Sequence, residues 1–79
     1  MTPRSPQLLT LGRTIRKVRR DLDLSQEALA DRAGLSAKHV GEIERANKDP
    51  RISTVLRIAI ALELRAGELF SLYDERCDS

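Results

Sequence analysis

The sequence predicts an all-α fold, a compact five-helix bundle formed by one small domain. Apolar residues recur three or four positions apart in successive segments, which is the spacing of one face of an α-helix. Serine stands directly before two of these segments, where its side-chain oxygen caps a first helical turn. The 79 residues allow one core. Because the only aromatic residues are Phe70 and Tyr73, that core must be aliphatic.

The first predicted helix covers residues 8–22. Its apolar residues form a single stripe at helical spacing: Leu11, Ile15, Val18 and Leu22. Pro3 and Pro6 precede it. Proline does not continue a helix, so residues 1–7 are expected to form a flexible N-terminal tail.

Two short helices are predicted next, at residues 26–33 and 37–45. Ser25 and Ser36 are their expected caps. Gly34 follows the first of them, where a left-handed backbone costs little without a Cβ, and Leu35 offers an apolar plug between the two. Two capped helices around a short turn with glycine form a helix-turn-helix, whose second helix is sized for the DNA major groove.

The chain then returns to the core through two more predicted helices. Residues 46–51 are polar and include Pro50, so they are expected to form a loop. A helix is predicted from about residue 53 to residue 63. Five of its apolar residues can face the core: Val55, Leu56, Ile58, Ala59 and Leu62. A fifth helix is predicted at about residues 65–73. The domain thus spans residues 8–73, and residues 74–79 form a polar C-terminal tail.

Charge is distributed unevenly along the chain, although the net charge is only +2. Residues 1–51 contain 11 Lys and Arg against 7 Asp and Glu, whereas residues 52–79 contain 3 against 5. The basic half also contains the helix-turn-helix, which favours a surface that faces phosphates. A solvated helix face is the alternative for the basic cluster Arg13, Arg16, Lys17, Arg19 and Arg20.

Several classes of protein are not expected. No apolar run approaches the roughly 18 residues of a membrane span, and the N-terminus lacks a secretory signal. The single cysteine, Cys77, indicates a reduced, cytoplasmic protein. With one histidine and one cysteine, no metal site can be assembled within one chain. There is no nucleophile with a base, no glycine-rich phosphate loop and little room for a ligand pocket. We therefore expect no enzyme, cofactor or small-molecule ligand.

The chain resembles the lambda-repressor/Cro-type helix-turn-helix family, also called XRE-like. The resemblance covers about residues 11 to 70 and rests on these positions: Ile15, Arg16, Arg19, 24–30, 33–36, 43–45, Pro50, Val55, Leu56, Ile58, Ala59, Ala61, Leu62 and 68–70. It implies a transcriptional regulator that binds double-stranded DNA as a homodimer on an inverted repeat, with residues 37–45 in the major groove. The family commonly has glycine where this chain has Ala46.

The resemblance places the base readers on the predicted helix at residues 37–45. The matching positions are Ala37, Lys38 and Glu42, with His39 and Gly41 nearby. Lys38 suits guanine O6 and N7, Glu42 suits cytosine N4, and Ala37 suits a thymine methyl. Two alternatives stay open: Lys38 contacts phosphate instead, or Glu42 rejects wrong sequences rather than reading one.

The resemblance also implies phosphate contacts and one structural salt bridge. The expected phosphate contacts are Gln26, Ser36, Arg45, Lys48 and Arg16. Solvated positions are the alternative for Gln26, Arg45 and Lys48. Arg19 and Glu44 match a family pair that fixes the tilt of the recognition helix.

Dimerisation is expected through an apolar patch formed by Ile60, Leu64, Leu72 and Tyr73. The alternative is that these residues complete the core of a monomer. Small members of the family include restriction–modification controller proteins, which we favour, compact phage-type repressors and antitoxins. A different class, an antitoxin or coactivator-like module that binds protein partners, is the rival interpretation. The acidic residues of the C-terminal end suit either contact with RNA polymerase or solubility.

Overall fold

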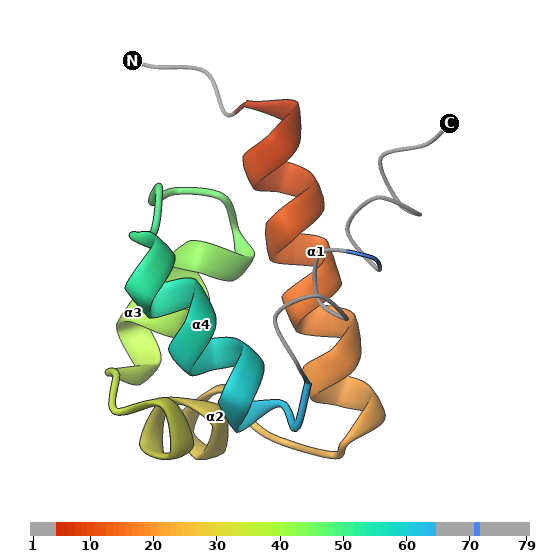
Figure 1. Cartoon of the computed structure of the whole chain (residues 1–79), viewed down its shortest axis with the longest axis vertical. Helices are drawn as coiled ribbons and strands as arrows, with labels where there is room; N and C mark the ends of the chain where they lie inside the picture. Colours follow the sequence, from red (N-terminus) through yellow and green to blue (C-terminus); the bar gives the residue numbers. More distant parts are fainter. Residues whose placement is uncertain (1–4, 65–70, 72–79) are drawn as a thin grey trace.

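A computed structural model describes residues 5–64 and Ser71. Within these residues the chain forms four helices: α1 (Pro6–Asp21), α2 (Gln26–Ala33), α3 (Ala37–Glu44) and α4 (Ile52–Ala61). Figure 1 shows α1 along one side of the molecule, with α2, α3 and α4 gathered on the other. None of the helices in the described part of the chain is long and apolar enough to cross a membrane.

The prediction of a five-helix bundle is wrong for the described residues, which contain four helices. Leu62 caps α4, and Glu63 follows in the left-handed region with a φ of 61°. The N–H groups of Glu63 and Leu64 donate to the carbonyls of Ile60 and Ala59, which closes the last turn. The helix therefore stops there. The fifth predicted helix, at residues 65–73, lies outside the described residues apart from Ser71.

Helix α1 begins two residues earlier than predicted. Ser5 is its N-cap, and the Ser5 Oγ accepts a hydrogen bond from the Leu8 N–H at 3.1 Å. Pro6 occupies the first helical position, where the missing N–H costs nothing because that group has no partner within a helix. The prediction that residues 1–7 are a tail was wrong for Pro6 and Gln7. Proline is unfavourable in the interior of a helix but is tolerated in its first turn.

The predicted helix-turn-helix caps are confirmed. The Ser25 Oγ accepts from the Ala28 N–H at 3.0 Å, and the Ser36 Oγ accepts from the His39 N–H at 3.1 Å. Gly34 adopts the left-handed conformation with a φ of 70°. The Leu35 N–H then donates to the Ala30 carbonyl at 2.9 Å, and the Leu35 side chain packs against the core. These bonds set the angle at which α3 leaves the turn.

The exit from α3 keeps a glycine-like backbone although the residue there is Ala46. Ala46 has a φ of 61° and is buried. Its N–H donates to the Ile43 carbonyl, and the Asn47 N–H donates to the Glu42 carbonyl at 2.8 Å. This pair of bonds is the Schellman motif, which usually places glycine at the left-handed position. The left-handed conformation of Ala46 costs about 1–2 kcal/mol, and burial of its methyl group offsets part of this cost.

The core lies where α2 packs against both α3 and α4, and α1 packs against α3. Its largest fully buried side chains are aliphatic except for Thr14: Ile15, Leu29, Ile43, Ile58, Leu62, Val40 and Thr14. Two residues predicted for the core, Leu22 and Leu56, are instead 38% and 39% exposed. Leu22 is the C-cap of α1, beyond the regular helix, and Leu56 lies on the solvent side of α4.

Helices α1 and α3 approach each other most closely at Gly12. A Cβ on this residue would lie 2.5 Å from the Glu44 carbonyl oxygen and 2.7 Å from that of Ile43. Both atoms belong to the backbone of α3, so they cannot move aside as a side chain can. Gly12 therefore sets the distance between α1 and the C-terminal end of α3.

Candidate nucleic-acid interface

The predicted base readers occupy the first turns of α3. Lys38 is exposed, whereas Ala37, His39 and Glu42 are half-buried. Ala37 packs partly against the core, so only part of its methyl group faces solvent. The structure brings Lys38 and Glu42, four residues apart, onto adjacent turns of one helix. Direct contacts from these residues to bases remain a prediction.

Gly41 differs from the other predicted base readers because it is buried. A Cβ on Gly41 would lie 2.9 Å from the Arg45 Nη1 and 3.4 Å from the Gln26 Oε1. The absent side chain therefore makes room for two of the predicted phosphate contacts. This position favours a role for Gly41 in spacing Arg45 and Gln26 rather than in touching a base.

A buried network joins α1, α2 and α3. The Arg19 Nε donates to the Glu44 Oε2 at 2.6 Å, and the Arg19 Nη2 donates to the Glu44 Oε1 at 3.1 Å. The two side chains are only 10% and 3% exposed. The third Arg19 hydrogen bond goes to the Leu24 carbonyl at 2.7 Å, so it also holds the segment between α1 and α2. The predicted Arg19–Glu44 salt bridge is present.

The same network positions Gln26 at the start of α2. The Gln26 Nε2 donates to the Glu44 Oε1 at 3.1 Å. This uses one of the two amide hydrogens and leaves the second available as a donor to an anion. Glu44 thus links the guanidinium of Arg19 to the amide of Gln26, and both partners fix the end of α3.

Gln26 lines a surface depression of about 370 Å³ between α1, α2 and α3. The other lining residues come from α1 and from the C-terminal end of α3: Arg16, Arg19, Arg20, Glu44 and Arg45. Arg19 and Glu44 neutralise each other at its base, so the remaining charges are cationic. Two predicted phosphate contacts, Arg16 and Arg45, therefore lie around the same depression as Gln26.

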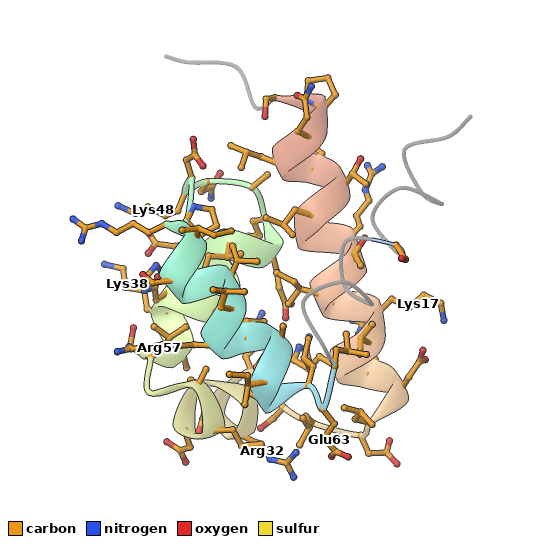
Figure 2. All side chains as sticks on the ribbon, in the orientation of Figure 1. Lys17, Arg32, Lys38, Lys48, Arg57 and Glu63 are labelled. Carbon is orange, nitrogen blue, oxygen red and sulfur yellow. The ribbon has the colours of Figure 1, made fainter. Side chains whose placement is uncertain are left out.

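The other two predicted phosphate contacts lie near the ends of α3. Ser36 is exposed, but its Oγ already accepts the His39 N–H. Its hydroxyl hydrogen is still available as a donor. Lys48 is in the exposed loop after α3, and Lys38, Lys48 and Arg57 project from the same side of the molecule (Figure 2). Phosphate binding by all five residues remains a prediction.

Three features of this surface were not among the predicted site residues. Gly12 controls the approach of α1 to α3, and a glycine within a helical apolar pattern was the available signal. Arg20 lines the depression beside Gln26. Arg57 projects on the Lys38 side from α4, and nothing in its sequence position indicates this.

The predicted dimerisation residues are only partly described. Ile60 is 75% exposed, and it continues an exposed apolar stripe of α4 that begins with Ile52 and Leu56. Leu64 is half-buried and packs against the core. Leu72 and Tyr73 lie outside the described residues.

The capped turn, the order of the helices and the buried network indicate one family. Residues 15–69 match the model of the helix-turn-helix family. The chain belongs to that family. The immunity repressor protein of Bacillus phage phi105 is 33% identical over 61 residues, which is 77% of this chain and 42% of the repressor. The chain thus spans less than half the length of that relative.

For other relatives of this helix-turn-helix protein, the match covers a larger share of the relative's own length. Control protein C.SmaI of Serratia marcescens is 33% identical over 61 residues, 77% of this chain and 73% of that protein. The crystal structure of the restriction-modification controller protein C.AhdI from Aeromonas hydrophila superposes with a TM-score of 0.81. It is 35% identical and the match covers 84% of this chain and 100% of that one. The fold is also that of the restriction-modification controller protein C.Esp1396I, whose crystal structure shows a tetramer in complex with its natural 35 base-pair operator. The two chains superpose with a TM-score of 0.91 at 24% identity, and the match covers 95% of this chain and 99% of that one.

Proposed function

We propose that this protein is a sequence-specific regulator of transcription that binds double-stranded DNA as a homodimer. The observation that carries the proposal is the exposed Lys38 on the first turn of α3, together with a cationic depression at the C-terminal end of that helix in which the Arg19–Glu44 pair holds Gln26. Within the family we favour a restriction–modification controller protein. This preference is supported by the extent of the matches, because this chain matches the whole length of C.AhdI but only 42% of the length of the phage repressor.

Base readout is assigned to the exposed face of α3. Lys38 is the exposed residue among the predicted base readers, and its ammonium group can donate hydrogen bonds to guanine O6 and N7. Glu42, one turn later, accepts from cytosine N4 or repels sequences without a suitable donor. His39 lies beside them and supplies a further polar contact.

Phosphate binding is assigned to the two ends of the helix-turn-helix. Gln26, Arg16 and Arg45 converge on the depression between α1, α2 and α3, so they bind the same stretch of backbone. Lys48 and Ser36 bind backbone at the α3 side. These contacts position α3 without reading sequence, and they make the affinity dependent on salt.

Dimerisation is assigned to the α4 stripe. One α3 reads only a few base pairs, and a two-fold dimer doubles the site by placing two such helices about one DNA turn, roughly 34–36 Å, apart. Ile60 is the most exposed large apolar residue in the described part of the chain. A second copy that covers it removes apolar surface from water.

The test is selection of bound duplexes from a random DNA pool at near-physiological salt, which suppresses nonspecific phosphate attraction. The expected result is an inverted repeat with half-site centres about ten base pairs apart. Folded protein that enriches no sequence would contradict the proposal. It would favour a protein-binding module, and a pull-down with the products of neighbouring genes would then identify the partner.

A further inference from the structure

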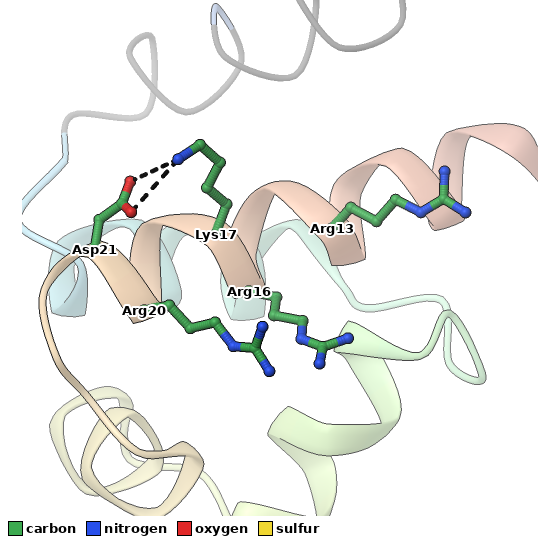
Figure 3. A pocket seen from close by; sticks show the side chains of 5 residues that line it. All are labelled: Arg13, Arg16, Lys17, Arg20 and Asp21. Atoms are coloured by element: carbon green, nitrogen blue, oxygen red, sulfur yellow. Dashed lines mark hydrogen bonds and ion pairs between the residues drawn. The ribbon is translucent and has the colours of Figure 1, made fainter.

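Three arginines follow one another along α1 outside the helix-turn-helix. Arg13, Arg16 and Arg20 are three and four residues apart, so they lie on one face of the helix, and all three are exposed. Figure 3 shows Arg16 and Arg20 extending to one side of α1, while Lys17 extends to the other and meets Asp21. We call Arg13, Arg16 and Arg20 the arginine row.

The arginine row has no carboxylate partner among the described residues. The ion pairs found there are Lys17–Asp21, Arg19–Glu44 and Arg32–Glu63. Like charges at these spacings repel one another and weaken an isolated helix. Arg20 complements the negative C-terminal end of the α1 dipole, but Arg13 and Arg16 lie too far from that end to do so. A bound polyanion would offset the repulsion.

The row is continuous with the candidate interface. Arg16 and Arg20 line the depression that contains Gln26 and Arg45. The same two arginines, with Arg13, Lys17 and Asp21, line a second, shallower depression on α1. The one carboxylate that lines the second depression, Asp21, is already paired with Lys17. A DNA strand bound at Gln26 can therefore continue along the shared arginines onto the row.

The dimensions fit a nucleic-acid backbone. Seven residues of helix separate Arg13 from Arg20, which corresponds to about 10 Å along the axis. Each phosphate of one strand rises about 3.4 Å along the duplex axis. Because the strand also winds around that axis, neighbouring phosphates are further apart than this rise, and the row spans about two phosphates. Guanidinium groups also bind phosphate oxygens in a bidentate manner.

We propose that the arginine row binds phosphates of the DNA strand beyond the base pairs read by α3, and so lengthens the footprint of each half-site. Arg13 and Arg20 are the residues it adds to the interface. This inference rests on the proposed function. The affinity gained is independent of the flanking sequence, because phosphate contacts carry no base information.

The experiment compares two operator duplexes obtained from the pool selection. The short form ends at the outer edges of the half-sites, and the long form adds about ten base pairs at each end. The variant is R13Q/R20Q in the full chain. The control is R32Q, which removes a positive charge from a residue that is paired with Glu63 and lines neither depression. Thermal unfolding checks that both variants are folded.

We expect the wild-type protein to bind the long duplex more tightly than the short one, and R13Q/R20Q to lose that difference. On the long duplex, the slope of log K against log salt should fall by about 2, one unit for each lost phosphate contact. The control should keep both the slope and the preference for the long duplex.

Each contrary result is distinguishable. A pool selection from which the folded wild-type protein enriches no sequence refutes the proposed function itself. Wild-type protein that binds both duplexes, with R13Q/R20Q indistinguishable from the control, refutes the arginine row alone. If R13Q/R20Q keeps its DNA affinity but no longer binds RNA polymerase holoenzyme, the row recognises an acidic protein surface and the proposal is wrong.

Discussion

Gly12 of α1 lies directly against the carbonyl of Glu44 at the end of α3, with no space for a Cβ between them. The Glu44 side chain meanwhile holds Arg19 and Gln26. Glu44 thus contacts α1 through its backbone carbonyl, and it holds Arg19 and Gln26 through its carboxylate. A change in the distance between α1 and α3 would therefore move Glu44 and, through their hydrogen bond, Gln26.

Gly12→Ala tests this relationship. The added methyl group would stand 2.5 Å from the Glu44 carbonyl oxygen. Overpacking of this kind costs about 1–3 kcal/mol, and the higher helix propensity of alanine offsets up to about 1 kcal/mol of that cost. We expect a net loss of stability of about 1–2 kcal/mol in urea unfolding, with weaker DNA binding. Unchanged stability would show that the two helices are free to separate.

Gly41→Ala is the matched glycine substitution, and we expect the opposite effect on stability. Its Cβ meets the flexible ends of Arg45 and Gln26 rather than a backbone. Alanine in a helix interior stabilises by about 0.8–1 kcal/mol over glycine, so stability should be retained or increased. DNA affinity should fall because the Arg45 guanidinium is displaced. Full affinity in a titration with operator DNA would show that the present Arg45 position is not used.

Arg19→Met should destabilise the protein and weaken DNA binding together. It leaves the buried Glu44 carboxylate with Gln26 alone, and breaking a buried ion pair typically costs about 3–5 kcal/mol. A domain of this size has a total stability of roughly 4–12 kcal/mol, so the variant should be measured at low temperature.

The double variant R19M/E44M separates stability from positioning. It removes both charges, so urea unfolding should show recovery of most of the lost stability. DNA binding should stay weak because Gln26 has lost its acceptor. Recovery of both properties in R19M/E44M would contradict the positioning role of the network.

Much of the helix-turn-helix was predictable because its signals are local. Ser25, Ser36 and Gly34 fix caps and a turn through atoms within four residues of themselves. The bounds of α2 were predicted to the residue for the same reason. The Arg19–Glu44 pair spans 25 positions, and it was predicted only through the resemblance to a family.

The incorrect predictions have two causes, the tertiary position of a helix face and a local rule applied too widely. Leu56 has the spacing of a core residue, yet the rotation of α4 against α2 leaves it at the surface. The contact of Gly41 with a base stays a prediction, but the spacing of the sequence did not indicate that this residue lies against Arg45 and Gln26. Pro6 was excluded from α1 by a rule that does not apply to a first helical turn. Ser5 directly before Pro6 was a local signal for a capped first turn, whereas no local pattern shows which face of α4 is covered.

Ile60→Glu should give a folded monomer. Ile60 is 75% exposed, so a charged side chain there costs little in the isolated chain but is unfavourable when a second copy covers it. Sedimentation equilibrium measures the change. Leu22→Glu, an exposed apolar residue away from α4, is the control and should leave the dimer intact. A dimer formed by Ile60→Glu would exclude this stripe as the interface.

Lys38→Ala distinguishes base readout from phosphate binding at the most exposed predicted reader on α3. If Lys38 contacts guanine, the selected operator should lose about 1–3 kcal/mol of binding free energy, and discrimination should relax at one base pair only. Lys48→Ala is the comparison, since its loop position predicts a uniform loss on all sequences and a smaller salt slope. We expect the two variants to differ in this way, because Lys38 projects from the first turn of α3 while Lys48 lies beyond its end. A uniform loss for Lys38→Ala would assign it to the backbone and leave Glu42 and His39 as the sequence readers.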